Sequence, residues 1–101
     1  MNASTAVARI LKAEGVEIAF CFPTSPLIEA AAEEGIRIIT CRTERTVTHM
    51  ADAYARVTNG KKIGVCFVQN GPGIENAFVG VAEAYADSTP MLMMPSGPRT
   101  T

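Results

Sequence analysis

Two features of the sequence place chemically useful groups where a strand gives way to a helix. Glu44 follows the apolar run 38–41, and the turn Asn-Gly-Pro-Gly at 70–73 follows the apolar run 63–69. A carboxyl group can accept or release a proton, and glycines allow a ligand to approach the backbone closely. The carboxyl ends of parallel strands meet at one edge of a sheet, and open α/β folds bind their ligands there. We therefore expect both features to contribute to one site.

Glu44 has two interpretations. In the first, it begins a helix, and its charge only complements the helix dipole and the free backbone amides of the first turn. In the second, the flanking strand and the apolar stripe that begins at Val47 shield it from water. Carboxyl groups in such surroundings can exchange protons near neutral pH, and a single acid of this kind suits a heteroaromatic nitrogen.

The turn 70–73 is equally open to two interpretations. Asn, Gly and Pro are the residues that a strand-to-helix turn requires. Alternatively, the free amides of the following helix hold an anion or the polar edge of a ring. The turn is neither a Walker A loop nor a G-x-G-x-x-G motif, because neither Gly-Lys-Ser/Thr nor a third glycine follows. His49 has no identifiable Ser or Cys nucleophile beside it, so we interpret it as a surface histidine.

The sequence predicts alternating helices and strands, and these elements would position Glu44 and the turn 70–73. Ser4 or Thr5 is predicted to cap the first helix, and Gly15 to end it. Pro90 prevents the last helix from continuing. Strands are expected at 18–22, 37–41, 63–69 and 91–94, and the later helices at 27–34, 45–58 and 74–86.

Two of these helices carry apolar residues at helical spacing, and we expect these stripes to be buried. The stripe of 45–58 consists of Val47, Met50, Ala51, Tyr54 and Ala55. The stripe of 74–86 consists of Ile74, Ala77, Phe78, Val81, Ala82 and Tyr85.

The strands are apolar nearly throughout and alternate with helices, which predicts a parallel sheet covered on both faces. The fold class is therefore α/β, a doubly wound, Rossmann-like three-layer αβα sheet that is truncated after about four strands. A chain of 101 residues is one domain at most and can bury a modest core. We expect its last strand to leave a bare sheet edge.

The composition excludes several functional classes. With 48% hydrophobic and 19% charged residues and a formal net charge of -1, the chain lacks the basic balance of a nucleic-acid binder. It contains neither a signal-peptide pattern nor an apolar run of membrane-spanning length, so we expect a cytoplasmic protein without a membrane partner. Cys21, Cys41 and Cys66 each lie in an apolar run, which predicts buried reduced thiols, and no metal-binding spacing is present.

Four segments of the sequence add up to a family resemblance. They are 15–20 with Pro23, 42–44 leading into 49–56, 70–76, and 84–90. In this order they resemble the N-terminal pyrimidine-binding domain of thiamine diphosphate enzymes, most closely the acetolactate synthase and 2-oxo acid decarboxylase group. The match covers nearly the whole chain. Thr43 departs from the pattern, since a histidine often precedes the glutamate in this family.

The resemblance implies a role for each residue of the expected site. Glu44 would be the catalytic glutamate that hydrogen-bonds N1′ of the cofactor's aminopyrimidine ring and promotes its imino tautomer. The imino group would remove the thiazolium C2 proton, giving the ylide that attacks a 2-oxo acid. The same resemblance implies that the cofactor-binding residues, besides Glu44, are Pro23, Thr24, Gly71, Pro72, Gly73 and Asn76.

Members of this family bind the diphosphate and its Mg²⁺ through a separate domain with a Gly-Asp-Gly motif, which does not occur here. Residues 1–101 are therefore expected to be a partial pyrimidine-binding domain that lacks the diphosphate-binding domain, whether as a fragment, a truncated product or one piece of a split enzyme. The resemblance implies a homo- or hetero-oligomer in which another domain or subunit holds the Mg²⁺, with no metal site in this chain.

The leading hypothesis is thus part of a thiamine diphosphate enzyme that decarboxylates or ligates 2-oxo acids and is inactive as this chain alone. A second hypothesis is a small noncatalytic α/β module that binds an anion or a nucleotide at the start of the helix 74–86. A third is an inert truncation product that folds poorly.

Overall fold

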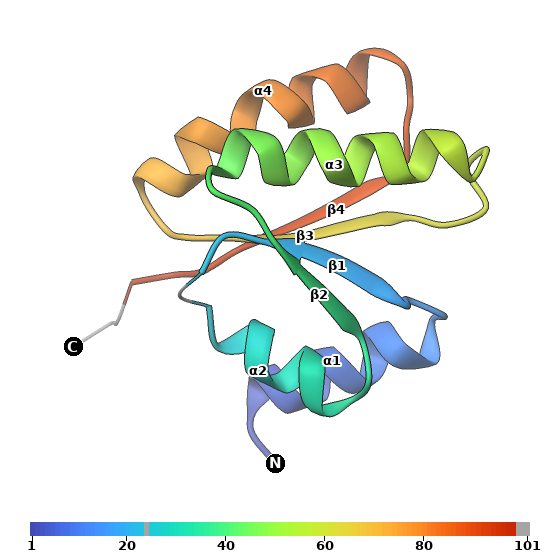
Figure 1. The fold of residues 1–101 in the computed structure, drawn as a ribbon. Helices are drawn as coiled ribbons and strands as arrows, with labels where there is room; N and C mark the ends of the chain where they lie inside the picture. Colours follow the sequence, from blue (N-terminus) through green and yellow to red (C-terminus); the bar gives the residue numbers. More distant parts are fainter. Residues whose placement is uncertain (24, 99–101) are drawn as a thin grey trace.

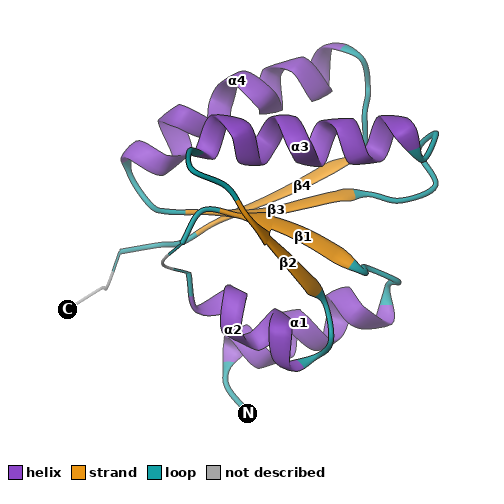
Figure 2. Ribbon diagram, viewed as in Figure 1, coloured by secondary structure: helices purple, strands orange, loops and turns teal. Residues whose placement is uncertain are grey.

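A computed structural model of the protein describes residues 1–23 and 25–98. Within these residues the chain forms three layers, with a four-stranded sheet in the middle and two helices on each face (Figures 1 and 2). The predicted αβα architecture is confirmed.

The first half of the chain supplies one helical layer and two strands. Asn2 caps the first helix by accepting a hydrogen bond from the backbone amide of Thr5 at 2.9 Å. The prediction that Ser4 or Thr5 is the cap was therefore wrong, because Asn2 has the extended backbone and the side-chain oxygen that a cap needs. Ser25 caps the second helix. The elements are α1 (Ala3–Ala13), β1 (Ile18–Cys21), α2 (Pro26–Glu33) and β2 (Arg37–Thr40).

The second half supplies the other helical layer and two more strands. The elements are α3 (Glu44–Val57), β3 (Gly64–Val68), α4 (Pro72–Ala86) and β4 (Met91–Pro95). Thr43 caps α3 by accepting a hydrogen bond from the amide of Thr46 at 3.2 Å. Helix α4 starts from Gly71, whose φ of 61° suits glycine, and no side chain caps it. Both helices begin one or two residues earlier than the periodicity predicted.

All strands are parallel and lie in the order β2-β1-β3-β4. The chain runs outward from β1 to β2, then returns past β1 to β3, so the strand order reverses between β1 and β3. Ligands of open α/β sheets bind outside the carboxyl ends of the strands at such a reversal. Helices α3 and α4 both start at this edge, α3 directly after the β2–α3 turn and α4 directly after the β3–α4 turn.

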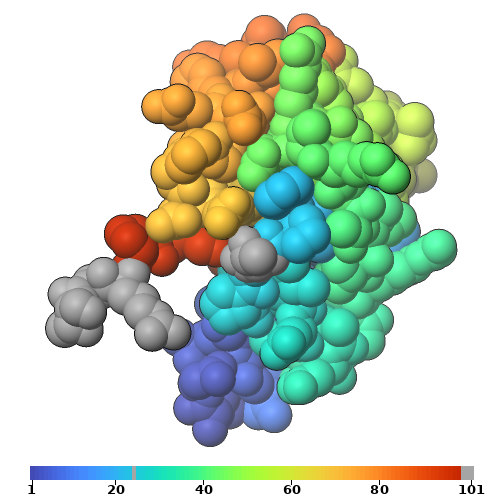
Figure 3. All heavy atoms as spheres, turned by 60° about the vertical axis from the view of Figure 1, so that its left-hand side comes forward, coloured from blue at the N-terminus to red at the C-terminus, as the bar shows by residue number. Residues whose placement is uncertain are grey.

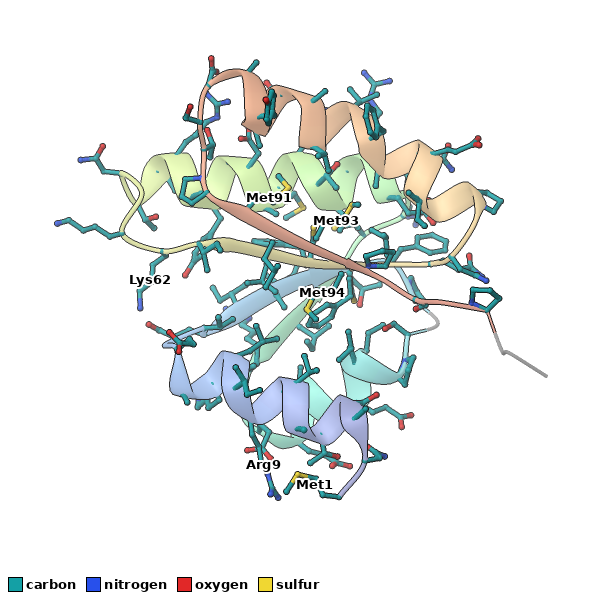
Figure 4. All side chains as sticks on the ribbon, turned by 180° about the vertical axis from the view of Figure 1, so that it is seen from behind. Met1, Arg9, Lys62, Met91, Met93 and Met94 are labelled. Carbon is teal, nitrogen blue, oxygen red and sulfur yellow. The ribbon has the colours of Figure 1, made fainter. Side chains whose placement is uncertain are left out.

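Apolar side chains fill the space on both sides of the sheet. The cluster beneath α1 and α2 includes Leu11, Ala31, Ile36 and Phe67, and the cluster beneath α3 and α4 includes Phe20, Val47, Ala51, Cys66 and Ala77. Residues of β4 alternate between them as a strand requires: Met93 packs on the α3 and α4 side and Met94 on the other (Figure 4).

The predicted buried stripe is confirmed for α3 and wrong for α4. Val47, Ala51 and Ala55 of α3 are fully buried, with Met50 and Tyr54 half-buried beside them. In α4, the four residues that face inward are small ones, Gly73, Ala77, Gly80 and Ala84. Of the predicted α4 stripe only Ala77 is buried, because α4 approaches α3 so closely that larger side chains are turned outward.

Candidate functional site

Glu44 is the first residue of α3 and lies at the carboxyl edge of the sheet with only 5% of its surface exposed. Because Thr43 already caps α3, the Glu44 carboxylate does not serve as the cap of its own helix. A carboxylate that merely complemented the helix dipole could remain in water, whereas this one is buried. The burial expected from the second interpretation of Glu44 is therefore present.

The Glu44 carboxylate meets the first two turns of α4. Asn76 Nδ2 donates a hydrogen bond to Glu44 Oε1 at 3.4 Å. On the other side, a Cβ atom built on Gly73 would lie 3.1 Å from Glu44 Oε2 and 3.0 Å from Gln69 Cβ. The carboxylate thus occupies the space that the missing side chain of Gly73 leaves open, and the two sequence features do share one site.

The remaining predicted site residues surround this pair less closely. Gly71 and Pro72, at the start of α4, are exposed, and so is Pro23, two residues after the end of β1. Figure 3 brings this edge forward and shows the segment after β1 in light blue next to the start of α3 in green, with the turn before α4 in yellow-orange. Thr24 lies outside the residues that the structure describes.

A stripe of buried polar residues on α3 was not predicted. Glu44, Thr48 and Asp52 recur every four residues, so they lie on one side of the helix, and all three are buried. Asp52 Oδ2 pairs with Arg56 Nε at 2.8 Å, while Oδ1 is buried without a partner among the described residues. The spacing was visible in the sequence, but buried polar residues are rare enough that their spacing alone does not indicate burial.

His49 is a surface histidine, as predicted. Its Nδ1 atom lies 2.8 Å from Glu83 Oε2, and both side chains are well exposed. This pair links α3 to α4 at some distance along the helices from Glu44.

The three cysteines are buried free thiols, as predicted. Burial raises the pKa of Cys21 and Cys41 and raises the pKa of Cys66 to about 12. A thiol is nucleophilic only as the thiolate, so these side chains act as small apolar core residues at neutral pH.

The surface has two hollows that could hold a ligand, one at each edge of the sheet. One of about 340 Å³ lies between the first turns of α3 and α4 and is lined by Thr43, Arg45, Glu75, Asn76 and Val79. A second, of about 270 Å³, lies at the opposite edge of the sheet, where Tyr54 and the ion pair of Lys62 with Glu17 line it. The first edge is the better candidate, because the buried acid and the glycine turn are there, whereas the second hollow is lined by the exposed Lys61 and by Lys62, which is half-buried and already paired.

Within residues 1–23 and 25–98, no group of three or more His, Cys, Asp or Glu side chains is arranged to hold a metal ion. In the same residues, no helix has the length and apolar character needed to cross a membrane.

Comparison with known proteins identifies relatives over the whole chain. The family model described as "Thiamine pyrophosphate enzyme, N-terminal TPP binding domain" matches residues 1–101. The chain is 40% identical to the "Probable 2-ketoarginine decarboxylase AruI" of Pseudomonas aeruginosa, across 95% of this chain and 17% of that protein. It is 43% identical to the "Acetolactate synthase large subunit" of Lactococcus lactis, across 91% of this chain and 16% of that protein. The chain is also 38% identical to the "Probable acetolactate synthase large subunit" of Methanococcus aeolicus, across 93% of this chain and 16% of that protein. The chain therefore spans 16 or 17% of the length of these relatives.

Proposed function

Because the chain belongs to the thiamine pyrophosphate enzymes and matches their N-terminal TPP binding domain over its full length, we propose that Glu44 is the acid that hydrogen-bonds N1′ of the cofactor's pyrimidine ring. The observation that carries this proposal is the position of the Glu44 carboxylate, which is buried at the carboxyl edge of the sheet between Asn76 and Gly73.

The residues around Glu44 fit such a ring. Glu44 Oε2 has no hydrogen-bond donor among the described residues, so it is available to a ring nitrogen, and the buried setting limits competition from water. Gly73 leaves the room that the carboxylate occupies, because any side chain there would meet Glu44 Oε2. Gly71 and Pro72 would line the same pocket from the β3–α4 turn, and the segment of Pro23 and Thr24 would line it from the end of β1.

Thiamine diphosphate, when bound, supplies the carbanion chemistry that these enzymes use. This chain would hold the pyrimidine, and Glu44 would hold or release a proton at Oε2. The carboxylate suits that task because its contacts with Asn76 and Gly73 hold it in one place. We propose that the substrate is a 2-oxo acid that is decarboxylated or ligated, as the names of the relatives suggest.

We further propose that residues 1–101 are only the pyrimidine-binding part of the site. Another domain or subunit would bind the diphosphate with its Mg²⁺, and the chain alone would be inactive. The exposed side of α4 supports a partner there, because Phe78 and Tyr85 are 64% and 87% exposed, with Ile74 and Val79 beside them. Large apolar side chains gathered on one surface are typical of an interface.

The proposal is tested by replacing the acid with its amide in the complete enzyme that carries this domain. Glu44→Gln keeps the size of the side chain but cannot exchange the proton, so we expect turnover to fall by about 10²–10⁴-fold. The matched control is Glu33→Gln, which removes an exposed acid from the end of α2, away from the site. Turnover of a 2-oxo acid is measured with saturating thiamine diphosphate and Mg²⁺. If Glu44→Gln keeps the activity of the control, Glu44 does not have this role.

A further inference from the structure

The two oxygens of the Glu44 carboxylate have different surroundings. Oε1 accepts the hydrogen bond from Asn76 Nδ2, whereas Oε2 lies against Gly73 without a donor among the described residues. We infer that Asn76 is a positioning residue: its amide fixes Oε1 as an acceptor, so that Oε2 carries the exchangeable proton and faces the ligand. This inference rests on the proposed function for the identity of the ligand, but not for the hydrogen bond itself.

The arrangement follows from helix geometry. Gly73 and Asn76 are three residues apart in α4, so they lie one above the other on the same side of the helix. Glu44 reaches that side from the first turn of α3, which packs against α4. Asn76 holds the Glu44 carboxylate through Oε1, and Gly73 leaves room for Oε2. The carboxylate therefore has one preferred orientation, and a proton-transfer group needs such a fixed orientation.

The direction of the hydrogen bond determines the location of the proton. The amide nitrogen of Asn76 is a donor only, so Oε1 accepts, and in a protonated carboxyl group the carbonyl oxygen is a better acceptor than the hydroxyl oxygen. The protonated acid therefore carries its hydrogen on Oε2. With the amide turned over, Asn76 Oδ1 would face the ionised carboxylate oxygen, which is repulsive.

The first test needs neither cofactor nor activity. The side-chain amide protons of Asn76 are observed by ¹H–¹⁵N NMR as the pH is varied across the titration range of carboxyl groups. We expect the pH-dependent shift of these resonances to be clearly larger in the unmodified protein than in Glu44→Gln, in which only the exposed neighbours Glu75 and Arg45 remain. The side-chain amide of Asn59, exposed in the turn after α3, is the internal control and is expected to stay constant in both. A pH-independent Asn76 amide would overturn the inference.

The second test uses the complete enzyme with thiamine diphosphate and Mg²⁺. Asn76→Leu removes the donor without adding charge, and Asn76→Asp puts a second carboxylate in its place. We expect kcat to fall about tenfold in Asn76→Leu while KM changes little, because a general acid that is present but misdirected loses part of its effect. We expect kcat to fall further in Asn76→Asp, because a second carboxylate at this position repels the Glu44 carboxylate instead of holding it.

These outcomes separate the inference from the proposed function. If Glu44→Gln abolishes turnover and Asn76→Leu leaves kcat unchanged, the proposed function stands and Asn76 has no positioning role. If Glu44→Gln keeps full turnover while the Asn76 amide follows pH, the hydrogen bond is real and the proposed function is wrong. Asn76 is exposed, so both variants are expected to fold, and thermal unfolding checks this.

Discussion

The two sides of α4 differ in the size of their residues. The side that faces α3 carries Gly73, Ala77, Gly80 and Ala84, spaced by four, three and four residues. The adjacent side carries Ile74, Phe78, Val81 and Tyr85 with the same spacing, and three of these are exposed. Both sides satisfy the helical repeat, so periodicity alone does not decide which of them is buried.

The small residues on the inward side allow α4 to approach α3 closely. A Cβ atom on Gly80 would lie 2.1 Å from Thr48 Oγ1 and 2.9 Å from the carbonyl carbon of the same residue. Helix α4 therefore packs directly against the backbone of α3, and this close approach brings Asn76 and Gly73 to Glu44. The site depends on the inward side of α4, and the outward side is free for a partner.

The largest effect on stability is expected at the closest approach of the two helices. Gly80→Ala would raise helix propensity and on that ground alone would stabilise the protein by about 1 kcal/mol. The clash with Thr48 predicts the opposite sign, a loss of about 1–3 kcal/mol, because both helices must move. Urea unfolding of the two proteins measures the difference.

Ala82→Leu is the control for this prediction, since it adds bulk to an exposed position of the same helix. Its unfolding free energy is expected to stay within about 0.5 kcal/mol of the unmodified value. A stabilised Gly80→Ala protein would mean that the two helices do not touch at this point.

The fold could be predicted from the sequence because local patterns dictate most of it. Apolar runs bounded by Gly15 and by the turn at 70–73 indicate strands, and helices of 14 and 15 residues between them leave a parallel sheet as the consistent arrangement. The inward side of α4 could not be predicted in this way. Hydrophobicity ranks Phe78 above Gly80, but the burial of each depends on how closely α3 approaches, which is a property of the packed structure.

The candidate site was predictable in its location and less so in its contacts. The positions of Glu44 and of the glycine turn at the ends of successive strands place both at one edge. The hydrogen bond from Asn76 to Glu44 joins residues 32 apart in sequence, and it depends on how two helices cross. Local signals carry no information on that crossing, so the family resemblance implied only that Asn76 lines the expected pocket and did not pair it with the acid.

A smaller effect on stability is expected at the inward glycine beside the acid. In Gly73→Ala the new Cβ would lie 3.1 Å from Glu44 Oε2, the end of a side chain that can shift slightly, and 3.0 Å from Gln69 Cβ, which moves only with its backbone. The gain in helix propensity and the cost of the tighter packing should nearly cancel. The free energy of unfolding is therefore expected to stay within about 1 kcal/mol of that of the unmodified protein.

The displaced Oε2 should nevertheless weaken cofactor binding in the complete enzyme by about tenfold, equivalent to about 1.4 kcal/mol. Isothermal titration calorimetry with thiamine diphosphate and Mg²⁺ measures this. An unchanged dissociation constant would show that the position of Oε2 beside Gly73 does not affect cofactor binding.

The smallest effect on stability is expected on the outward side of α4. Replacing Phe78 and Tyr85 together by Gln removes two aromatic side chains that are 64% and 87% exposed and keeps good helix formers. The free energy of unfolding of the 101-residue chain should then change by no more than about 0.5 kcal/mol. If this side binds the domain that completes the cofactor site, the same change should weaken that association by about 2 kcal/mol or more, because buried aromatic residues dominate binding energy.

Val57→Gln is the control for the outward side, since Val57 is 81% exposed but lies at the end of α3. Sedimentation of each variant mixed with the diphosphate-binding part of the enzyme compares their association with that of the unmodified chain. Equal association of all three proteins would mean that the large apolar residues of α4 are not the partner surface. The small residues on the inward side of α4 would then still explain its packing against α3, but the large apolar residues on the outward side would have no assigned role.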